Sequence, residues 1–135
     1  MIHYTDTTAG MTPDHLQGFF THWANPPTAE ALLRILQGSD YIVLAIDSDA
    51  NRVVGYITAI TDGVSCAYIP HLEVFEGLRG QGIGQELVRR MLEKLNHLYM
   101  IDLMCDPELQ PFYEKLGFRR STGMLIRNYV RQRCD

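Results

Sequence analysis

A glycine-rich bend constrains this chain more than any other feature of its sequence. Residues 72–87 read LEVFEGLRGQGIGQEL, in which an apolar strand end runs into the bend and then into an amphipathic helix. Gly80, Gly82 and Gly84 remove every second side chain where backbone N–H groups emerge at the positive end of the helix dipole. Arg79 adds a fixed positive charge at the rim. The bend therefore predicts a seat for a phosphate group.

The spacing of the glycines excludes two well-known phosphate motifs. The dinucleotide fingerprint needs a glycine where this chain has Gln85, and the P-loop needs a lysine that does not follow these glycines. The remaining pattern is R-x-x-G-x-G, formed by Arg79, Gly82 and Gly84. An alternative stays open, in which the glycines serve only a tight backbone turn.

Composition limits the classes of function. A chain of 135 residues with a net charge of −4 is expected to form one domain, residues 1–135, that does not hold nucleic acid by phosphate neutralisation. No stretch has the length of a membrane span, and the N-terminus lacks a signal pattern. The cysteines are odd in number and lack C-x-x-C spacing, which favours free thiols and a cytoplasmic location: Cys66, Cys105 and Cys134. The scattered histidines predict no metal site: His3, His15, His22 and His97.

Hydrophobic periodicity predicts an α/β (α+β) chain with the order β-α-α-β-β-β-α-β-α-β. Thr12 and Pro13 start a first helix that carries Leu16, Phe19, Phe20 and Trp23, and Thr28 caps a second helix that ends at Gly38. The other expected elements are strands at residues 2–5, 41–46, 53–60, 66–75, 99–105 and 118–127, and a short helix at residues 109–116. The helix that follows the glycine bend is expected to carry these residues on one apolar face: Leu87, Val88, Met91, Leu92 and Leu95. The charged face of the helix after the bend is expected to be solvated: Arg89, Arg90, Glu93 and Lys94.

A second informative stretch is FYEKLGF, residues 112–118. Phe112, Leu116 and Phe118 are expected core anchors, and Gly117 is the expected helix stop. These structural roles do not account for Tyr113.

The R-x-x-G-x-G bend followed by this F-Y-x-x-x-G-F segment resembles the GNAT superfamily of acyl-CoA-dependent N-acetyltransferases, over residues 41–127. The resemblance implies a mixed, mostly antiparallel central sheet flanked by helices, with acetyl-CoA as cosubstrate and no metal. It implies that the coenzyme pyrophosphate lies on Arg79, Gly80, Gln81, Gly82, Ile83 and Gly84. Strands 66–75 and 99–105 would separate to admit the pantetheine arm, which would pair with backbone groups of Leu72 and Val74. The Val74 N–H would polarise the thioester carbonyl.

The resemblance also implies that Tyr113 is the general acid that protonates the leaving thiolate. The chain departs from the family at Asp106, where many members carry asparagine, so the coenzyme role of that asparagine is not transferred. Asp102 and Cys105 are interpreted as structural.

The general base is less defined by the sequence. Strand alternation puts Ile69, His71, Glu73 and Phe75 on one face, so Glu73, with His71 assisting, is the predicted base. The alternative is that Glu73 accepts hydrogen bonds from loop N–H groups and His71 is a structural residue of the sheet. Trp23, at the expected helix end, is the predicted substrate contact through a cation–π interaction with an amine.

The sequence thus predicts an N-acetyltransferase that moves an acetyl group from acetyl-CoA to a primary amine of a small molecule or peptide by direct attack. A non-catalytic acyl-CoA-binding regulatory module is the alternative. No nucleic-acid or membrane partner is expected. Residues 125–130 could pair with a second chain, which makes a homodimer possible.

Overall fold

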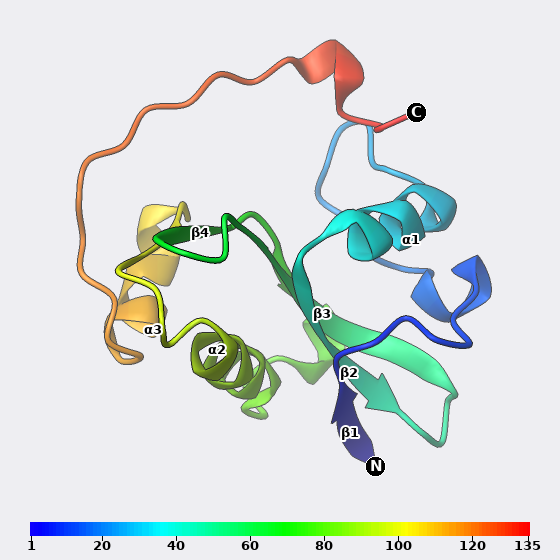
Figure 1. Cartoon of the computed structure of the whole chain (residues 1–135). Coiled ribbons are helices and arrows are strands. Elements are labelled where there is room, and N and C mark those ends of the chain that lie inside the picture. The colour runs from blue at the N-terminus through cyan, green and yellow to red at the C-terminus, as the bar shows by residue number, and fades with distance from the viewer.

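The computed structural model describes residues 1–135 and contains one six-stranded sheet with helices on both faces (Figure 1). The strand order is β1-β2-β3-β4-β6, and β5 pairs with β3 beside β4. Only β4 and β6 run parallel; the other pairs are antiparallel. The strands are β1 (Ile2–Thr5), β2 (Tyr41–Asp47), β3 (Arg52–Thr61), β4 (Cys66–Ile69), β5 (Leu72–Val74) and β6 (Met100–Leu103). The helices are α1 (Ala29–Gly38), α2 (Ile83–Lys94) and α3 (Gln110–Glu114), and the 3-10 turns are η1 (Pro13–Leu16), η2 (Glu76–Leu78), η3 (Pro107–Leu109) and η4 (Tyr129–Arg131). The predicted fold class, a mixed sheet flanked by helices, is confirmed.

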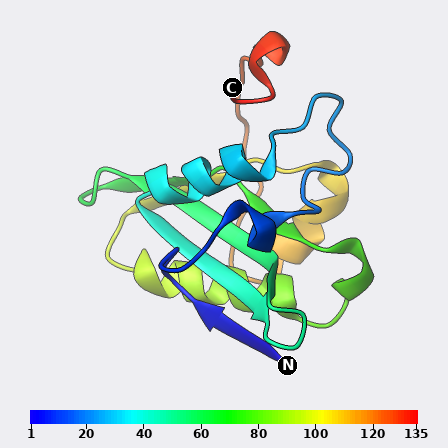
Figure 2. The ribbon, with the colours of Figure 1, turned by 90° about the vertical axis from the view of Figure 1, so that its right-hand side faces the viewer.

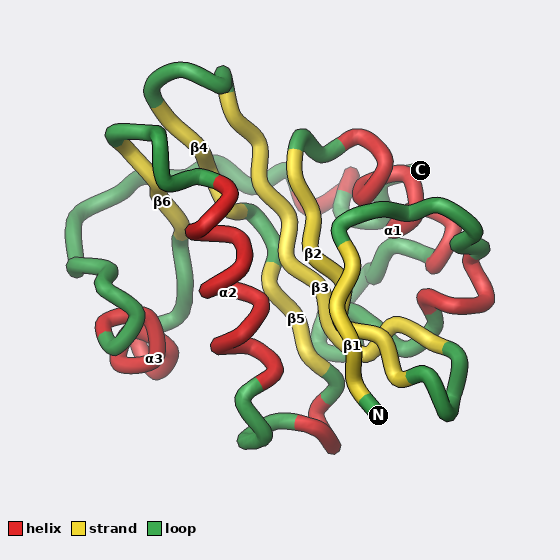
Figure 3. Tube along the Cα trace, turned by 60° about the horizontal axis from the view of Figure 1, so that its bottom comes forward, coloured by secondary structure: helices red, strands yellow, loops and turns green.

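Each face of the sheet has its own apolar core. Helix α2 packs on one face of the sheet (Figure 3). There Leu87, Val88 and Met91 are buried against residues of β2 and β3. Helix α1 and the η1 segment pack on the other face, around the fully buried Tyr56 ring. The β-branched and aromatic residues of β2 and β3 are buried from both sides, which explains their nearly continuous apolar sequence.

The predicted first helix is wrong beyond Leu16. Only the single 3-10 turn η1 forms, because Gly18 and Phe20 have left-handed backbones with φ of 98° and 62°. An α-helix cannot continue through such residues. Gly18 also leaves little room for a side chain, since a Cβ at this position would lie 3.3 Å from the Phe75 ring. Phe19 and Phe20 still bury, but on a loop rather than on one face of a helix.

The predicted strand at residues 66–75 is interrupted at Pro70, whose backbone lacks an N–H. The interruption changes which side chains share a face. Ile69 packs in the α2 core together with Leu72 and Val74, whereas His71 and Glu73 face the other layer. The prediction that Ile69 shares a face with Glu73 is therefore wrong.

The predicted last strand, residues 118–127, is absent. This segment is extended, but no backbone group of residues 119–127 bonds to another backbone group, so nothing pairs with it (Figure 1). The strand and helix predicted at residues 99–105 and 109–116 form over shorter spans, β6 and α3. Gly117 ends α3 as expected, with φ of 97° and its N–H donating to Glu114 O at 3.1 Å.

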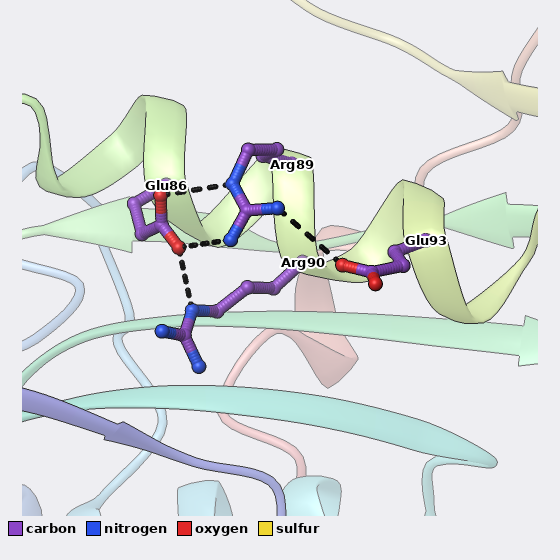
Figure 4. Close-up of polar contacts among 4 residues, drawn as sticks. All are labelled: Glu86, Arg89, Arg90 and Glu93. Atoms are coloured by element: carbon purple, nitrogen blue, oxygen red, sulfur yellow. Dashed lines mark hydrogen bonds and ion pairs between the residues drawn. The ribbon is translucent and has the colours of Figure 1, made fainter.

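The charged face of α2 is solvated, and its residues pair along the helix (Figure 4). Glu86 accepts from Arg89 and from Arg90 at 2.6 Å each, and Arg89 also reaches Glu93 at 3.4 Å. These hydrogen bonds hold the pKa of Glu86 at about 2. The arginines of this face are thus matched by carboxylates, and they do not add to the cation at the glycine bend. None of the helices is long and apolar enough to cross a membrane.

Candidate functional site

The glycine bend has the backbone that an anion seat requires. Gly80 and Gly82 are left-handed, with φ of 82° and 84°, and Gly82 is the N-cap of α2. The first α2 hydrogen bond runs from Glu86 N–H to Gly82 O at 3.0 Å, and no side chain caps the helix N-terminus. The amides of the first helical turn are therefore available to an anion at the positive end of the helix dipole.

Arg79 is positioned at this bend by the preceding strand. Its Nε donates to Val74 O at 3.3 Å. Arg79 forms no ion pair with a carboxylate, so its charge is not neutralised within the chain. A positive charge therefore lies between the end of β5 and the N-terminus of α2. The structure brings together every residue of the predicted pyrophosphate seat, since Gln81 and Ile83 lie in the same bend.

The strand before the bend has an unpaired edge. β4 pairs with β6 as far as Ile69 and Leu103, and β5 pairs only with β3. Thr58 N–H donates to His71 O, and Phe75 N–H donates to Val54 O. Antiparallel pairing alternates, so the backbone groups of Leu72 and Val74 point away from β3, into the separation between β5 and β6. An extended ligand can bond to this edge as a strand would.

Tyr113 lies on the α2 side of the sheet, in the same core as Val74 and Ile83. Its ring packs edge-on against Phe112 and Phe118, with centroids 5.0 and 5.6 Å apart. Burial, with a smaller effect of the Cys105 thiol, raises the pKa of Tyr113 to about 12. The hydroxyl is therefore protonated throughout the neutral range and can act as a proton donor. Tyr113 lines a groove of about 420 Å³ that extends along the end of β6 to Gly123.

Glu73 lies on the opposite face of the sheet from Tyr113. Both carboxylate oxygens accept from the Phe20 N–H, at 2.9 and 3.2 Å, and Phe20 is held in its left-handed backbone. Burial raises the pKa of Glu73, although the Phe20 N–H, Arg79 and His22 oppose the rise. This hydrogen bond from a loop N–H is the contact that the structural alternative for Glu73 predicts. A carboxylate with a raised pKa is also better suited to accept a proton.

His71 and Trp23 join Glu73 in an aromatic layer. The His71 ring lies 6.1 Å from Phe20, 6.3 Å from Trp23 and 6.4 Å from Tyr56, measured between ring centroids. Burial lowers the pKa of His71, so its neutral imidazole is favoured. Trp23 is 38% exposed, and its ring lies tilted against Phe20 with the centroids 4.7 Å apart, so Trp23 forms the rim of this layer.

Sequence reasoning missed Tyr56, which lies directly across from Glu73 in the β3–β5 register. Its side chain is fully buried, its hydroxyl has no hydrogen-bond partner, and the carboxylate of Glu73 contributes to a raised pKa after burial itself. Thr58, two residues along β3, also has a buried hydroxyl without a partner. Buried polar atoms without a partner are uncommon in protein cores, so each one calls for a structural or functional explanation. Only the strand register, which the sequence does not reveal, places Tyr56 beside Glu73.

The cysteines and Asp106 do not form a further candidate site. The three cysteines are free, and no group of three or more His, Cys, Asp or Glu side chains is arranged to hold a metal ion. Burial, together with Asp106, raises the pKa of Cys105, which favours the neutral thiol over a nucleophilic thiolate. Asp106 is the N-cap of η3 without a side-chain cap bond.

Comparisons with known proteins point to one family. The model of the acetyltransferase (GNAT) domain matches residues 7–132. A crystal structure of a candidate acetyltransferase from Deinococcus radiodurans R1 is 47% identical, with a TM-score of 0.94 over 97% of this chain and 91% of that one. A GNAT family acetyltransferase from Streptococcus pneumoniae TIGR4 is 30% identical, with a TM-score of 0.77 over 95% of this chain and 98% of that one.

Among curated sequences, glucosamine 6-phosphate N-acetyltransferase 1 from Oryza sativa subsp. japonica is 30% identical over 109 residues, covering 70% of this chain. The chain spans 57% to 66% of the length of the first curated relatives it matches.

Proposed function

Because the chain belongs to the GNAT acetyltransferase family, we propose that it transfers the acetyl group of acetyl-CoA to a primary amine of a small molecule or peptide. The observation that carries the proposal is the gap between β5 and β6. Its edge is formed by the backbone groups of Leu72 and by the N–H of Val74, which pair with no strand, and it opens beside the anion seat. Tyr113 lies on one side of the sheet at this gap, and Glu73 and His71 lie on the other. In this proposal residues 1–135 act as one domain.

The coenzyme would bind from the α2 side. Its pyrophosphate would accept hydrogen bonds from amides of residues 80–84, with Arg79 balancing the charge. Its pantetheine arm would pair with the edge of β5, and the thioester would reach the gap. The Val74 N–H there would stabilise the negative charge that develops on the carbonyl oxygen during attack.

The acceptor amine would approach from the aromatic side. Its nitrogen attacks the thioester carbonyl carbon, a C–N bond forms and the C–S bond breaks. Tyr113 gives its phenolic proton to the leaving sulfur, and the extra proton on the nitrogen passes to Glu73 or His71, directly or through water. Trp23 at the rim and Tyr56 within the layer would contact the acceptor and orient its amine.

Two observations support an amine acceptor. The Glu73 carboxylate and the Trp23 ring together suit a cation. The relative from Oryza sativa is named for an N-acetyltransferase reaction on the amino sugar glucosamine 6-phosphate, which makes that compound a natural member of an acceptor panel.

The test is an acceptor panel incubated with acetyl-CoA, with acetylated products detected by mass spectrometry. This detection avoids thiol reagents, which the exposed Cys134 would also consume. We expect acetylation of at least one primary amine. It should be lost in a variant of the anion seat but retained in a control, Val64→Ala, an exposed position in the β3–β4 turn. Calorimetric binding of coenzyme A without turnover of any amine would instead indicate the regulatory module, for which the hydrogen bond that occupies Glu73 provides a structural reason.

A further inference from the structure

Two hydroxyl groups on the aromatic side of the sheet have no partner in the chain. They belong to Tyr56 and Thr58 of β3, which are both fully buried, and neither oxygen makes a hydrogen bond. The two side chains leave the same face of β3, because Ile57 and Ala59, which alternate with them, pack in the α2 core. An unpaired buried hydroxyl reduces stability, so a pair of them on one face calls for an explanation beyond packing.

The two hydroxyls lie opposite the two groups proposed to accept the amine proton. Tyr56 is paired with Glu73 in the register of β3 and β5. Thr58 N–H donates to His71 O at 3.1 Å, so Thr58 lies across from His71. Neighbouring strands are about 4.8 Å apart. An acceptor whose amine nitrogen lies over β5 therefore places its nearest substituents over β3, at the hydroxyls.

The segment that covers this layer has little structure of its own. Residues 17–27 form neither helix nor strand, and their one backbone–backbone hydrogen bond runs from Trp23 N–H to Phe20 O at 3.1 Å. The segment is a loop between η1 and α1 (Figures 1 and 2). The rings of Phe19 and Phe20 lie against Tyr56, with centroids 5.0 and 6.4 Å away. This loop is the part of the layer that can move to admit an acceptor, with the exposed Trp23 ring at the entrance.

The free protein has already removed water from these hydroxyls. A hydrogen bond from Tyr56 or Thr58 to an acceptor oxygen is therefore not offset by the loss of a bond between that hydroxyl and water. An acceptor of the same shape without the oxygen leaves both hydroxyls unpaired. Sites built to hydrogen-bond a substrate group discriminate strongly against analogues that lack the group.

The oxygen that suits this site is neutral. Burial raises the pKa of Tyr56, and the Glu73 carboxylate adds to the rise, so a carboxylate on the acceptor would meet a like charge there. His71 does not offset that charge, because burial lowers its pKa and favours the neutral imidazole. The oxygen of an alcohol or an amide accepts hydrogen bonds without adding a second negative charge.

We propose that Tyr56 and Thr58 select the acceptor, by binding a neutral alcohol or amide oxygen that lies close to the amine to be acetylated. The inference rests on the proposed acetyltransferase activity and names its substrate class. That class is primary amines with a neighbouring hydroxyl or carboxamide, in preference to plain alkylamines and to amino acids with a free carboxylate. Thr58 is then a specificity-determining residue that takes no part in moving the acetyl group or the proton.

The experiment compares four amines of similar size: ethanolamine, glycinamide, propylamine and glycine. The kcat/KM for each is measured by mass spectrometry of the acetylated product, for the parent, Tyr56→Phe, Thr58→Val and Thr58→Ser. Each value is divided by that for propylamine, which has a methyl group in place of the ethanolamine hydroxyl. The pKa of each amine is the same for every enzyme, so a ratio that differs between enzymes does not report amine ionisation. Thr58→Ser is the matched control, because it keeps the hydroxyl and removes only a methyl group.

We expect the parent to prefer ethanolamine, glycinamide or both over propylamine. Tyr56→Phe and Thr58→Val should each reduce that preference about tenfold, whereas Thr58→Ser should retain it to within a factor of about three. The Kd for coenzyme A, measured by calorimetry, should not change, because neither residue belongs to the anion seat. The amine that loses its advantage in the variants identifies the oxygen as that of a hydroxyl or of an amide.

A preference that either Tyr56→Phe or Thr58→Val leaves unchanged would overturn the proposal, and so would a parent enzyme that prefers glycine. Both results would leave the acetyltransferase activity itself intact. If coenzyme A binds but no amine of this set or of the wider panel is acetylated, the proposed function fails, and this inference fails with it.

Discussion

Two alanine substitutions in the glycine bend, two residues apart, should change stability in opposite directions. Gly82 is left-handed at φ of 84°, and a Cβ there would meet nothing within 4 Å. Gly82→Ala therefore introduces backbone strain of about 1–2 kcal/mol without a clash. A smaller gain from the stiffer unfolded chain leaves a net loss of about 1 kcal/mol. Gly84 is in α2 with a negative φ, and its Cβ would lie 3.5 Å from the Phe112 ring, an ordinary contact. Gly84→Ala should stabilise by about 0.5–1 kcal/mol.

These free energies convert to measurable temperatures. An unfolding entropy of about 2.1 cal/mol/K per residue gives about 0.28 kcal/mol/K for 135 residues, so 1 kcal/mol shifts the Tm by about 3.5 °C. We expect the Tm to fall by about 3–4 °C in Gly82→Ala and to rise by about 2–3 °C in Gly84→Ala. Calorimetric melts of the two variants and the parent measure both shifts.

The same melts with coenzyme A test the anion seat. Ligand at about 100 times the parent Kd should stabilise the parent by about 2.7 kcal/mol, or about 9–10 °C. If Gly82→Ala moves the seat amides and weakens binding tenfold, the gain falls to about 1.4 kcal/mol, or about 5 °C. Equal ligand-induced shifts in parent and Gly82→Ala would refute the role of this backbone in binding. A Tm for Gly82→Ala at or above that of Gly84→Ala would refute the strain argument.

Three further predictions concern the side chains at the gap. Tyr113→Phe should lower kcat by about 10²-fold with little change in coenzyme Kd, because it removes only the proton donor; rapid-quench turnover within a factor of two of the parent would exclude the role. Burial raises the pKa of Glu73, so stability falls as pH rises from the ordinary pKa of the carboxyl through its raised pKa, and it falls no further above that. Glu73→Gln should accordingly melt at a higher temperature than the parent at pH 7 and lose this advantage below about pH 4.5. Its kcat/KM should fall at pH 7 and recover as the pH approaches the pKa of the acceptor amine. Parallel profiles of kcat/KM against pH for the variant and the parent would exclude Glu73 as the base. Tyr56→Phe removes a buried hydroxyl without a partner, so thermal melts should show stabilisation of about 1 kcal/mol or more, and steady-state kinetics should show a higher KM for the acceptor; an unchanged KM would remove Tyr56 from the acceptor side.

Local patterns in the sequence were sufficient for several elements. Thr28 caps α1 by accepting from Ala31 N–H at 3.1 Å, and Gly117 ends α3 with a left-handed backbone, both as the residue types indicate. The apolar face of α2 was also predictable, since Leu87, Val88 and Met91 are fully buried at helical spacing.

Other features depend on contacts that the sequence does not display. The spacing of Leu16, Phe19, Phe20 and Trp23 fits a helix, but the Phe20 N–H bonds to Glu73 across 53 positions of the chain. Phe20, which makes this long-range contact, has a left-handed backbone at a position where the spacing predicted a helical turn. The segment at residues 118–127 has strand-like composition, yet a strand also requires a neighbour, which a single copy does not supply.

The interruption at Pro70 has a consequence for how this protein can vary. Two odd-numbered side chains before Pro70, Ala67 and Ile69, share the α2 layer with the even-numbered Leu72 and Val74 after it. The chain therefore contains one residue more here than simple alternation needs. Deleting a single residue at this point would turn the following segment over by half a rotation. The Glu73 carboxylate would then face the apolar α2 layer, and the isopropyl group of Val74 would face the aromatic layer. Insertions and deletions should therefore be tolerated in the exposed turn at residues 62–64 and selected against at residues 70–71, where the length of the chain decides which chemistry faces each side of the sheet.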